Sequence, residues 1–293
     1  MTLALTVLQI VAPVFVLAAI GFAWVKAGYA YDTAFVTRLA MTLAVPALIF
    51  SALADTALDP AAVARVAWAT LLAYGAVLGA FWGICAVLRL DARTYVAPLT
   101  FGNTGNLGLP LALFAFGETG LALAVVVFAV MAILAFTVGL WIVAGGGNPM
   151  LALKEPMVGA TLLGGVFLWQ DWPVPDVAMN AIALVGEMAI PLMLITLGVA
   201  VARLRPGRVG LVVALSVLKA AISAFIGYGV GLWLDLGPVA LGVLVVQLAT
   251  PVAVTSYLLA EKYGADAEAV AGLVVVSTVL SVAILPIVLA FFV

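Results

Sequence analysis

The sequence predicts an all-α polytopic membrane protein with ten transmembrane helices, arranged as two inverted five-helix repeats. Three observations predict this fold class. First, 67% of the residues are hydrophobic and only 8% are charged, whereas soluble globular domains are about half apolar and a quarter charged. Second, the apolar residues form ten stretches of roughly the length that crosses a bilayer. Third, prolines recur at nearly the same offset in the two halves of the chain.

The expected spans follow one another with short polar connections between them. A window of about 20 residues places them at 4–25, 34–54, 63–88, 95–116, 119–143, 153–169, 177–202, 208–234, 238–260 and 268–292. No positive segment precedes the first span and no clear small-residue cleavage site follows it. We therefore interpret the first span as a retained helix and not as a signal peptide.

Basic residues set the expected orientation, because Lys and Arg near span ends stay on the cytoplasmic side. The connections that follow odd-numbered spans hold nine of them: Lys26, Arg38, Arg89, Arg93, Lys154, Arg203, Arg205, Arg208 and Lys262. The opposite side holds only Arg65. We therefore expect an integral protein of a bacterial inner (plasma) membrane, with both termini outside the cytoplasm.

We expect the chain to consist of two repeats that are separated by the run GGGNP at 145–149. The prolines that match across this run are Pro13 with Pro156, Pro46 with Pro191, Pro98 with Pro238 and Pro110 with Pro251. Residues 1–144 are the expected first repeat, 145–149 a linker and 150–293 the second repeat. Because five spans are an odd number, the second repeat enters the membrane inverted. Inverted repeats are typical of secondary transporters, whose sites lie at the midplane where discontinuous helices meet.

Two matching spans contain residues that disrupt a helix. The text TFGNTGNLGLPLAL at 100–113 interrupts the fourth span, and QLATPVAVTSY at 247–257 interrupts the ninth. Non-helical backbone at membrane depth is tolerated only where protein or a water-filled cavity surrounds it. We therefore expect two functional breaks inside the bundle. The alternative is a pair of proline kinks that packing stabilises.

The expected breaks predict a site for an anion. Asn106 ahead of Pro110, and Thr250 directly before Pro251, are interpreted as caps of restarted half-helices. The N-termini of such half-helices favour negative charge. Asn103 and Asn106 would present amides to a carboxylate, while Gly105 and Gly108 would allow close backbone approach. The expected substrate-binding residues are Asn103, Gly105, Asn106, Gly108, Pro110, Lys219, Gln247, Thr250 and Pro251.

Two ionisable residues, Lys219 and Glu187, lie deep in expected spans. A charge at such depth costs a few kcal/mol or more, so each should face protein or water. Lys219 has two interpretations. It is a functional cation, which balances an anionic substrate or replaces a coupling ion, or it is a structural donor to backbone carbonyls. Glu187 is either a functional residue, as a possible coupling group or ion-pair partner of Lys219, or a residue near the outer interface; whether the two residues pair stays open.

The sequence argues against several classes of chemistry. It contains no histidine and a single cysteine, Cys85, which removes a disulfide within the chain and most metal-ligand sets. No nucleotide-binding loop is present. We therefore expect no metal, no cofactor and no nucleic-acid partner.

The sequence resembles the auxin efflux carrier family, which includes plant auxin carriers and bacterial carriers of malonate and similar acids. The text that carries the resemblance is AVPALIFSALA (44–54), GNTGNLGLPLALFAFGE (102–118), the stretch 189–201, and ATPVAVTSYLLAEKYG (249–264). The chain lacks the long hydrophilic central loop of most plant members, and its third span has no acidic residue.

This resemblance implies a fold like that of bile-acid symporters and antiporters, in which broken helices 4 and 9 cross. It implies a homodimer-forming scaffold from spans 1, 2, 6 and 7, and a moving transport domain from spans 3–5 and 8–10. By similarity, Asn103 matches a substrate-contacting asparagine, and Pro110 and Pro251 match the crossover prolines.

The function expected from these features is that of a secondary transporter. It would move a small organic anion, an auxin-like or dicarboxylic acid, across the lipid bilayer by an elevator-type alternating-access mechanism. The residues are compatible with import or export, and with uniport or coupling to protons or sodium. The alternative is a membrane channel, or an intramembrane enzyme without a recognisable catalytic motif.

Overall fold

The structure is a computed structural model that describes residues 3–54, 59–146, 156–170, 172–203 and 209–293, and all regular elements in these ranges are helical. The elements of the first half are α1 (Leu3–Lys26), α2 (Thr33–Leu39), η1 (Ala40–Ala44), α3 (Val45–Ala54), α4 (Pro60–Val87), α5 (Ala92–Thr100), η2 (Thr104–Gly108), α6 (Leu109–Leu134), η3 (Ala135–Gly139) and α7 (Leu140–Ala144). Those of the second half are α8 (Pro156–Gln170), α9 (Asp176–Glu187), α10 (Ala189–Arg203), α11 (Val209–Trp233), α12 (Pro238–Ala249), α13 (Val254–Tyr263) and α14 (Ala267–Leu289). The three η elements are π-helices.

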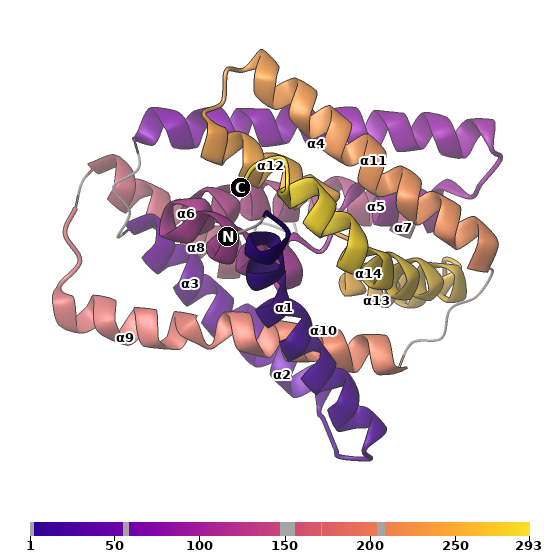
Figure 1. Cartoon of the computed structure of the whole chain (residues 1–293), viewed down its shortest axis with the longest axis horizontal. Coiled ribbons are helices and arrows are strands. Elements are labelled where there is room, and N and C mark those ends of the chain that lie inside the picture. Colours follow the sequence, from indigo (N-terminus) through magenta and orange to yellow (C-terminus); the bar gives the residue numbers. More distant parts are fainter. Residues whose placement is uncertain (1–2, 55–58, 147–155, 171, 204–208) are drawn as a thin grey trace.

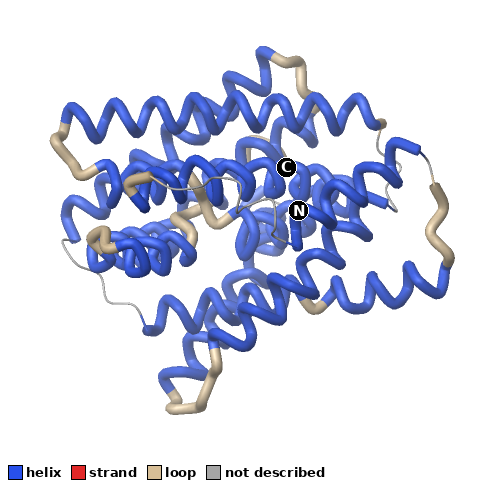
Figure 2. Tube along the Cα trace, turned by 180° about the vertical axis from the view of Figure 1, so that it is seen from behind, coloured by secondary structure: helices blue, strands red, loops and turns tan. Residues whose placement is uncertain are grey.

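The helices form an integral membrane protein in which two outer layers of helices enclose a central group. Helices α4 and α11 run along one side of the molecule, and α9 and α10 run along the opposite side (Figure 1). The same two layers enclose the short central helices in the view from behind (Figure 2). Helix α11 packs against α12, α14 and α4, while α1 packs mainly against α10 and α3 mainly against α8 and α9.

Within the described residues, seven helical stretches are long and apolar enough to cross a membrane, and Pro156–Gln170 and Pro238–Ala249 are shorter apolar helices. This number differs from the ten expected spans for two reasons. The expected ninth span is divided into α12 and α13, and most of the expected fourth and fifth spans fall in one continuous stretch, Thr104–Ala144. The stretch Thr104–Ala144 covers 41 residues, but Gly117 inside it has a φ of 67°, which breaks the helix there. The ten-span inverted repeat therefore stays a prediction, and most of the expected linker, 147–149, lies outside the described residues.

Aspartates in the connections begin several helices. Asp32, Asp59, Asp91 and Asp266 each accept a hydrogen bond from a backbone N–H in the first turn of α2, α4, α5 and α14. Such caps satisfy donors that have no partner inside the helix, and each contributes about 1 kcal/mol. The short polar connections therefore act as start signals for helices.

Basic residues that indicate the orientation also tie helix ends together. The Arg93 guanidinium donates to the carbonyl of Val143 at 3.0 Å and to that of Tyr263 at 2.7 Å. These carbonyls lie in the last turn of α7 and at the end of α13, before the left-handed residues Gly145 and Gly264. Arg93 thus joins two helix C-termini from different halves of the chain, in addition to any effect on topology.

Two glycines let α1 and α10 approach closely. A Cβ atom on Gly21 would overlap the Ile195 carbonyl, and one on Gly198 would overlap the Ala18 carbonyl. Both glycines are buried. Small residues that allow backbones to meet are the usual basis of helix packing in membranes.

We predict that Gly198→Ala lowers the free energy of unfolding by about 1–3 kcal/mol, because the new methyl group forces α1 away from α10. Thermal unfolding of the purified protein in detergent would measure this change. The matched control is Gly79→Ala on α4, where a Cβ meets nothing within 4 Å. The control should be neutral or stabilise by up to about 1 kcal/mol, and equal loss in both variants would contradict the packing argument.

We predict that both ends of the chain are extracytoplasmic, as the basic residues indicate. The first turns of α1 and the last turns of α14 share one hydrophobic cluster, so the N- and C-termini lie close together (Figure 1). A reporter that is active only in the cytoplasm should be silent when it is fused after Val293. The same reporter placed beside Arg89 should be active, and a strong signal at Val293 would contradict the topology.

Candidate functional site

The two expected breaks meet in the middle of the molecule. Helix α5 ends at Thr100 and α12 ends at Ala249, and extended backbone follows each of them. Gly102 and Val252 form an antiparallel bridge, and the Asn103 N–H donates to the Pro251 carbonyl at 2.7 Å. The interrupted segments therefore satisfy each other's backbone groups, as burial in a membrane protein requires.

The breaks do not have the caps that the sequence suggested. The second half-helix begins at Thr104 as a π-helix with Asn103 at the capping position, so Asn106 lies inside the helix and Pro110 does not set its start. Thr250 is the C-terminal cap of α12, and its hydroxyl donates to the Gln247 carbonyl at 2.6 Å. The cap interpretation of Asn106 and Thr250 was wrong. Backbone bonds between the two segments, rather than side-chain caps, fix where each helix restarts.

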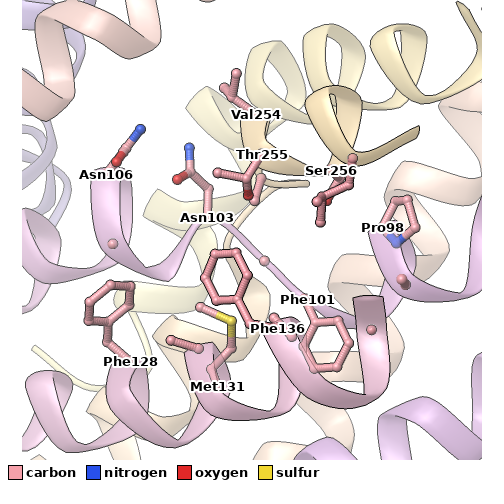
Figure 3. Close-up of a pocket in the computed structure, with 18 of the residues that line it drawn as sticks. Pro98, Phe101, Asn103, Asn106, Phe128, Met131, Phe136, Val254, Thr255 and Ser256 are labelled. Carbon is pink, nitrogen blue, oxygen red and sulfur yellow. The ribbon is translucent and has the colours of Figure 1, made fainter. Parts of the chain in front are cut away.

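A cavity of about 80 Å³ opens beside the meeting point, large enough for several water molecules or a small solute. Its polar lining comes from Asn103, Asn106, Thr255 and Ser256. Its apolar lining includes Met41, Phe101, Phe128, Met131, Phe136 and Met157. None of the described residues that line it is charged. In Figure 3 the two phenylalanine rings at 128 and 136 lie on the side opposite Thr255.

Two helix N-termini open on this cavity. The helix that begins at Thr104 contributes Gly105 and Asn106 to the lining, and α13, which begins at Val254, contributes its first residues. The first N–H groups of a helix have no partner inside it and carry partial positive charge. Two sets of backbone N–H groups with partial positive charge thus lie at the cavity, and none of its described lining residues is basic.

Asn103 is the best-placed donor in the cavity. Its backbone is engaged, since its N–H donates to Pro251 and its carbonyl accepts from the N–H groups of Leu107 and Gly108. Its side chain is 5% exposed, and Nδ2 has no hydrogen-bond partner. A buried donor without a partner costs about 1–3 kcal/mol. An amide held in this way is suited to donate to a ligand.

All three π-helices described above line the same cavity. They contribute Met41 from η1, Gly105 and Asn106 from η2, and Phe136 and Gly139 from η3. π-helices are rare and occur often at functional sites, where one extra residue per turn changes the direction of side chains. Sequence patterns did not reveal Met41, Phe128, Phe136 or Met157, because an apolar residue in an apolar helix looks the same whether it faces lipid, core or ligand.

Lys219 lies against the break and does not line the cavity. It is 1% exposed, and Nζ donates to the Thr250 carbonyl at 2.6 Å and to the Leu248 carbonyl at 3.3 Å. A Cβ on Gly102 would lie 3.3 Å from Nζ, and Gly102 itself lines the cavity. Lys219 therefore occupies the C-terminal end of α12, where a positive group is favourable, with one glycine between it and the cavity.

The other expected site residues lie beside the break. Gln247 is completely buried with both amide atoms unpartnered, and it packs so closely on Gly108 that a Cβ there would overlap its side chain. The expected residues outside the lining are Gly108, Pro110, Lys219, Gln247, Thr250 and Pro251.

Glu187 lies elsewhere, in a depression that Glu118, Leu113 and Ile190 also line. The structure gives no ion pair between Glu187 and Lys219, both of which it describes. The possible pairing of these two residues is thus not seen, and Lys219 is bonded instead to carbonyls at the break.

The comparisons with known proteins agree on a transporter. A family model described as membrane transport protein, the auxin efflux carrier family, matches residues 6–156 and 148–289. An uncharacterized transporter of Methanothermobacter thermautotrophicus (strain ATCC 29096 / DSM 1053 / JCM 10044 / NBRC 100330 / Delta H) is 25% identical to the chain over 270 residues. That alignment covers 87% of each protein.

We predict that Lys219→Met destabilises the protein. Methionine keeps much of the apolar stem but cannot donate, so the carbonyls of Leu248 and Thr250 lose their partner at about 1–3 kcal/mol each. The melting temperature in detergent should fall, whereas the exposed control Lys262→Met should melt like the parent. An unchanged melting temperature in Lys219→Met would show that these two hydrogen bonds do not stabilise the break.

Proposed function

We propose that this chain, which belongs to the membrane transport protein family, is a secondary carrier of a small organic anion. The resemblance seen in the sequence to the auxin efflux carrier family is thereby confirmed. The family and the relative indicate a transporter rather than an enzyme.

The observation that carries the anion proposal is the unpartnered amide of Asn103 in a cavity between two helix N-termini. Free backbone N–H groups and a neutral amide donate hydrogen bonds to an anion. Because they add no full charge, they can hold a carboxylate firmly enough to select it and weakly enough to release it. A carrier needs both properties.

The remainder of the lining supports a carboxylate with an apolar body. Phe101, Phe128 and Phe136 are aromatic, and three methionines, Met41, Met131 and Met157, also line the cavity. Thioether side chains adapt to irregular ligand shapes. A dicarboxylate would bring its second charge against this apolar wall without a described basic side chain to meet it. We therefore favour a monocarboxylic acid, aromatic or branched, as the substrate.

The packing supports a moving domain. Expected span 1 corresponds to α1, span 2 to α2, η1 and α3, span 6 to α8, and span 7 to α9 and α10. These helices pack mainly against one another. The cavity receives Met41 and Met157 from this group, and the rest of its lining from the other helices. We propose that the second group moves past the first, as in an elevator, and that the first forms a homodimer. Such motion would carry the site past the two methionines.

We predict that Asn103→Ala weakens binding of a carboxylate by about tenfold to a hundredfold. Losing one hydrogen bond to a charged group costs about 1.5–3 kcal/mol. A thermal-shift screen of carboxylates, with phenylacetate and malonate as first probes, would identify a ligand at two pH values with and without sodium. Calorimetry would then give the affinity of the parent and the variant.

The matched control is Asn180→Ala, which makes the same change at an exposed position of α9. This control should bind the carboxylate like the parent. Asn106→Ala should lose less affinity than Asn103→Ala, because Asn106 is only half-buried. Unchanged affinity in folded Asn103→Ala would refute the site.

A further inference from the structure

Lys219 has an unusual set of partners for a buried cation. Its two hydrogen-bond acceptors are backbone carbonyls, those of Thr250 and Leu248. An ammonium has three N–H donors, whereas a neutral amine has two donors and one lone pair. The two bonds that the structure shows therefore suit a neutral amine, and they leave the third donor of an ammonium without a partner.

The elements packed against α11 supply no buried carboxylate to Lys219. Helix α12 contains no titratable residue, and the titratable or charged residues of α4, α5 and α14 are Arg65, Tyr74, Cys85, Arg93, Tyr95 and Glu268. The buried ones are Tyr74, Cys85 and Tyr95, and Glu268 is exposed at the first turn of α14. The described elements around α11 thus offer Lys219 no buried carboxylate as a counter-ion, and its Nζ is bonded to the two carbonyls at the C-terminal end of α12.

Two hydroxyl groups lie one helical turn to either side of Lys219 on the same face of α11. Ser216 and Ser223 are 2% and 0% exposed, and neither Oγ has a hydrogen-bond partner. Elsewhere Thr70, Thr100 and Thr196 each donate to the carbonyl four residues earlier. A hydroxyl can donate to an amine or accept from an ammonium by rotating. Neither hydroxyl bonds Nζ in this structure, so both keep their full hydrogen-bonding capacity on the face of α11 that carries Lys219.

The cavity lies just beyond Gly102, where a Cβ would come within 3.3 Å of the Lys219 Nζ. A carboxylate held by Asn103 would place a negative charge across the Gly102 backbone from Nζ. An opposite charge close by favours the charged form of an amine. The empty and occupied cavities thus favour different protonation states of the same group.

We propose that Lys219 is a proton-binding site coupled to the anion. Its amine is neutral while the cavity is empty, and its lone pair takes up one proton from solvent when a carboxylate enters. The proposal rests on the anion-carrier function, and no other bond forms or breaks. One negative and one positive charge then cross together, so transport is electroneutral and a pH gradient drives it.

Nitrogen NMR tests the empty protein directly. The sequence has four lysines, at 26, 154, 219 and 262, so lysine labelled with ¹⁵N at Nζ gives few signals, and Lys219→Arg identifies the one of interest. In the full chain near neutral pH we expect that signal at the shift of a neutral amine, and the exposed Lys262 at that of an ammonium. An ammonium shift for Lys219 in the empty protein would overturn the proposal.

Calorimetry tests the coupling. Titration of phenylacetate in two buffers of different ionisation enthalpy should show uptake of about one proton per carboxylate. Lys219→Gln should bind without proton uptake, while Lys262→Gln should behave like the parent. Binding by the parent without proton uptake would overturn the coupling and leave the anion carrier standing. If neither phenylacetate nor malonate binds, the carrier proposal and the coupling that rests on it both fail.

Discussion

The structure depends on one constraint, which is that backbone groups in the membrane interior must have hydrogen-bond partners. Where α5 and α12 end, the partners come from the opposite break and from side chains behind it. Asn103 donates to Pro251, Lys219 donates to Thr250, and Ser277 accepts from the Val252 N–H at 3.0 Å. The two breaks thus share backbone partners through Asn103 and Pro251, and Lys219 and Ser277 supply further partners to the second break.

The same arrangement produces the site. Ending two helices in the interior exposes the N-termini of the helices that restart, and their free N–H groups are the donors on which the proposed anion site depends. The C-terminal ends of the interrupted helices are negative, and Lys219 lies at one of them. Positive and negative helix ends are thus separated by the thin layer of backbone at Gly102.

Part of this organisation could be predicted from residues alone. Composition identified a membrane protein, and the Gly, Asn and Pro residues at 100–113 together with Pro251 located the breaks, because such residues disrupt helices. The exact restart points could not be predicted. Asn106 and Thr250 have the chemistry of caps, but backbone bonds across the break outweighed them and moved the restarts to Thr104 and Val254.

The sequence by itself determined the environment of the chain, the positions of its interruptions and the neutral polar groups near them, since these follow from residue type and local spacing. Only the tertiary structure decided which residues share a cavity. Met41, Phe136 and Met157 come from helices far apart in the chain, and nothing local distinguishes them from residues that face lipid. The placement of Lys219 behind Gly102 was decided in the same way, by the packing of α11 on α12.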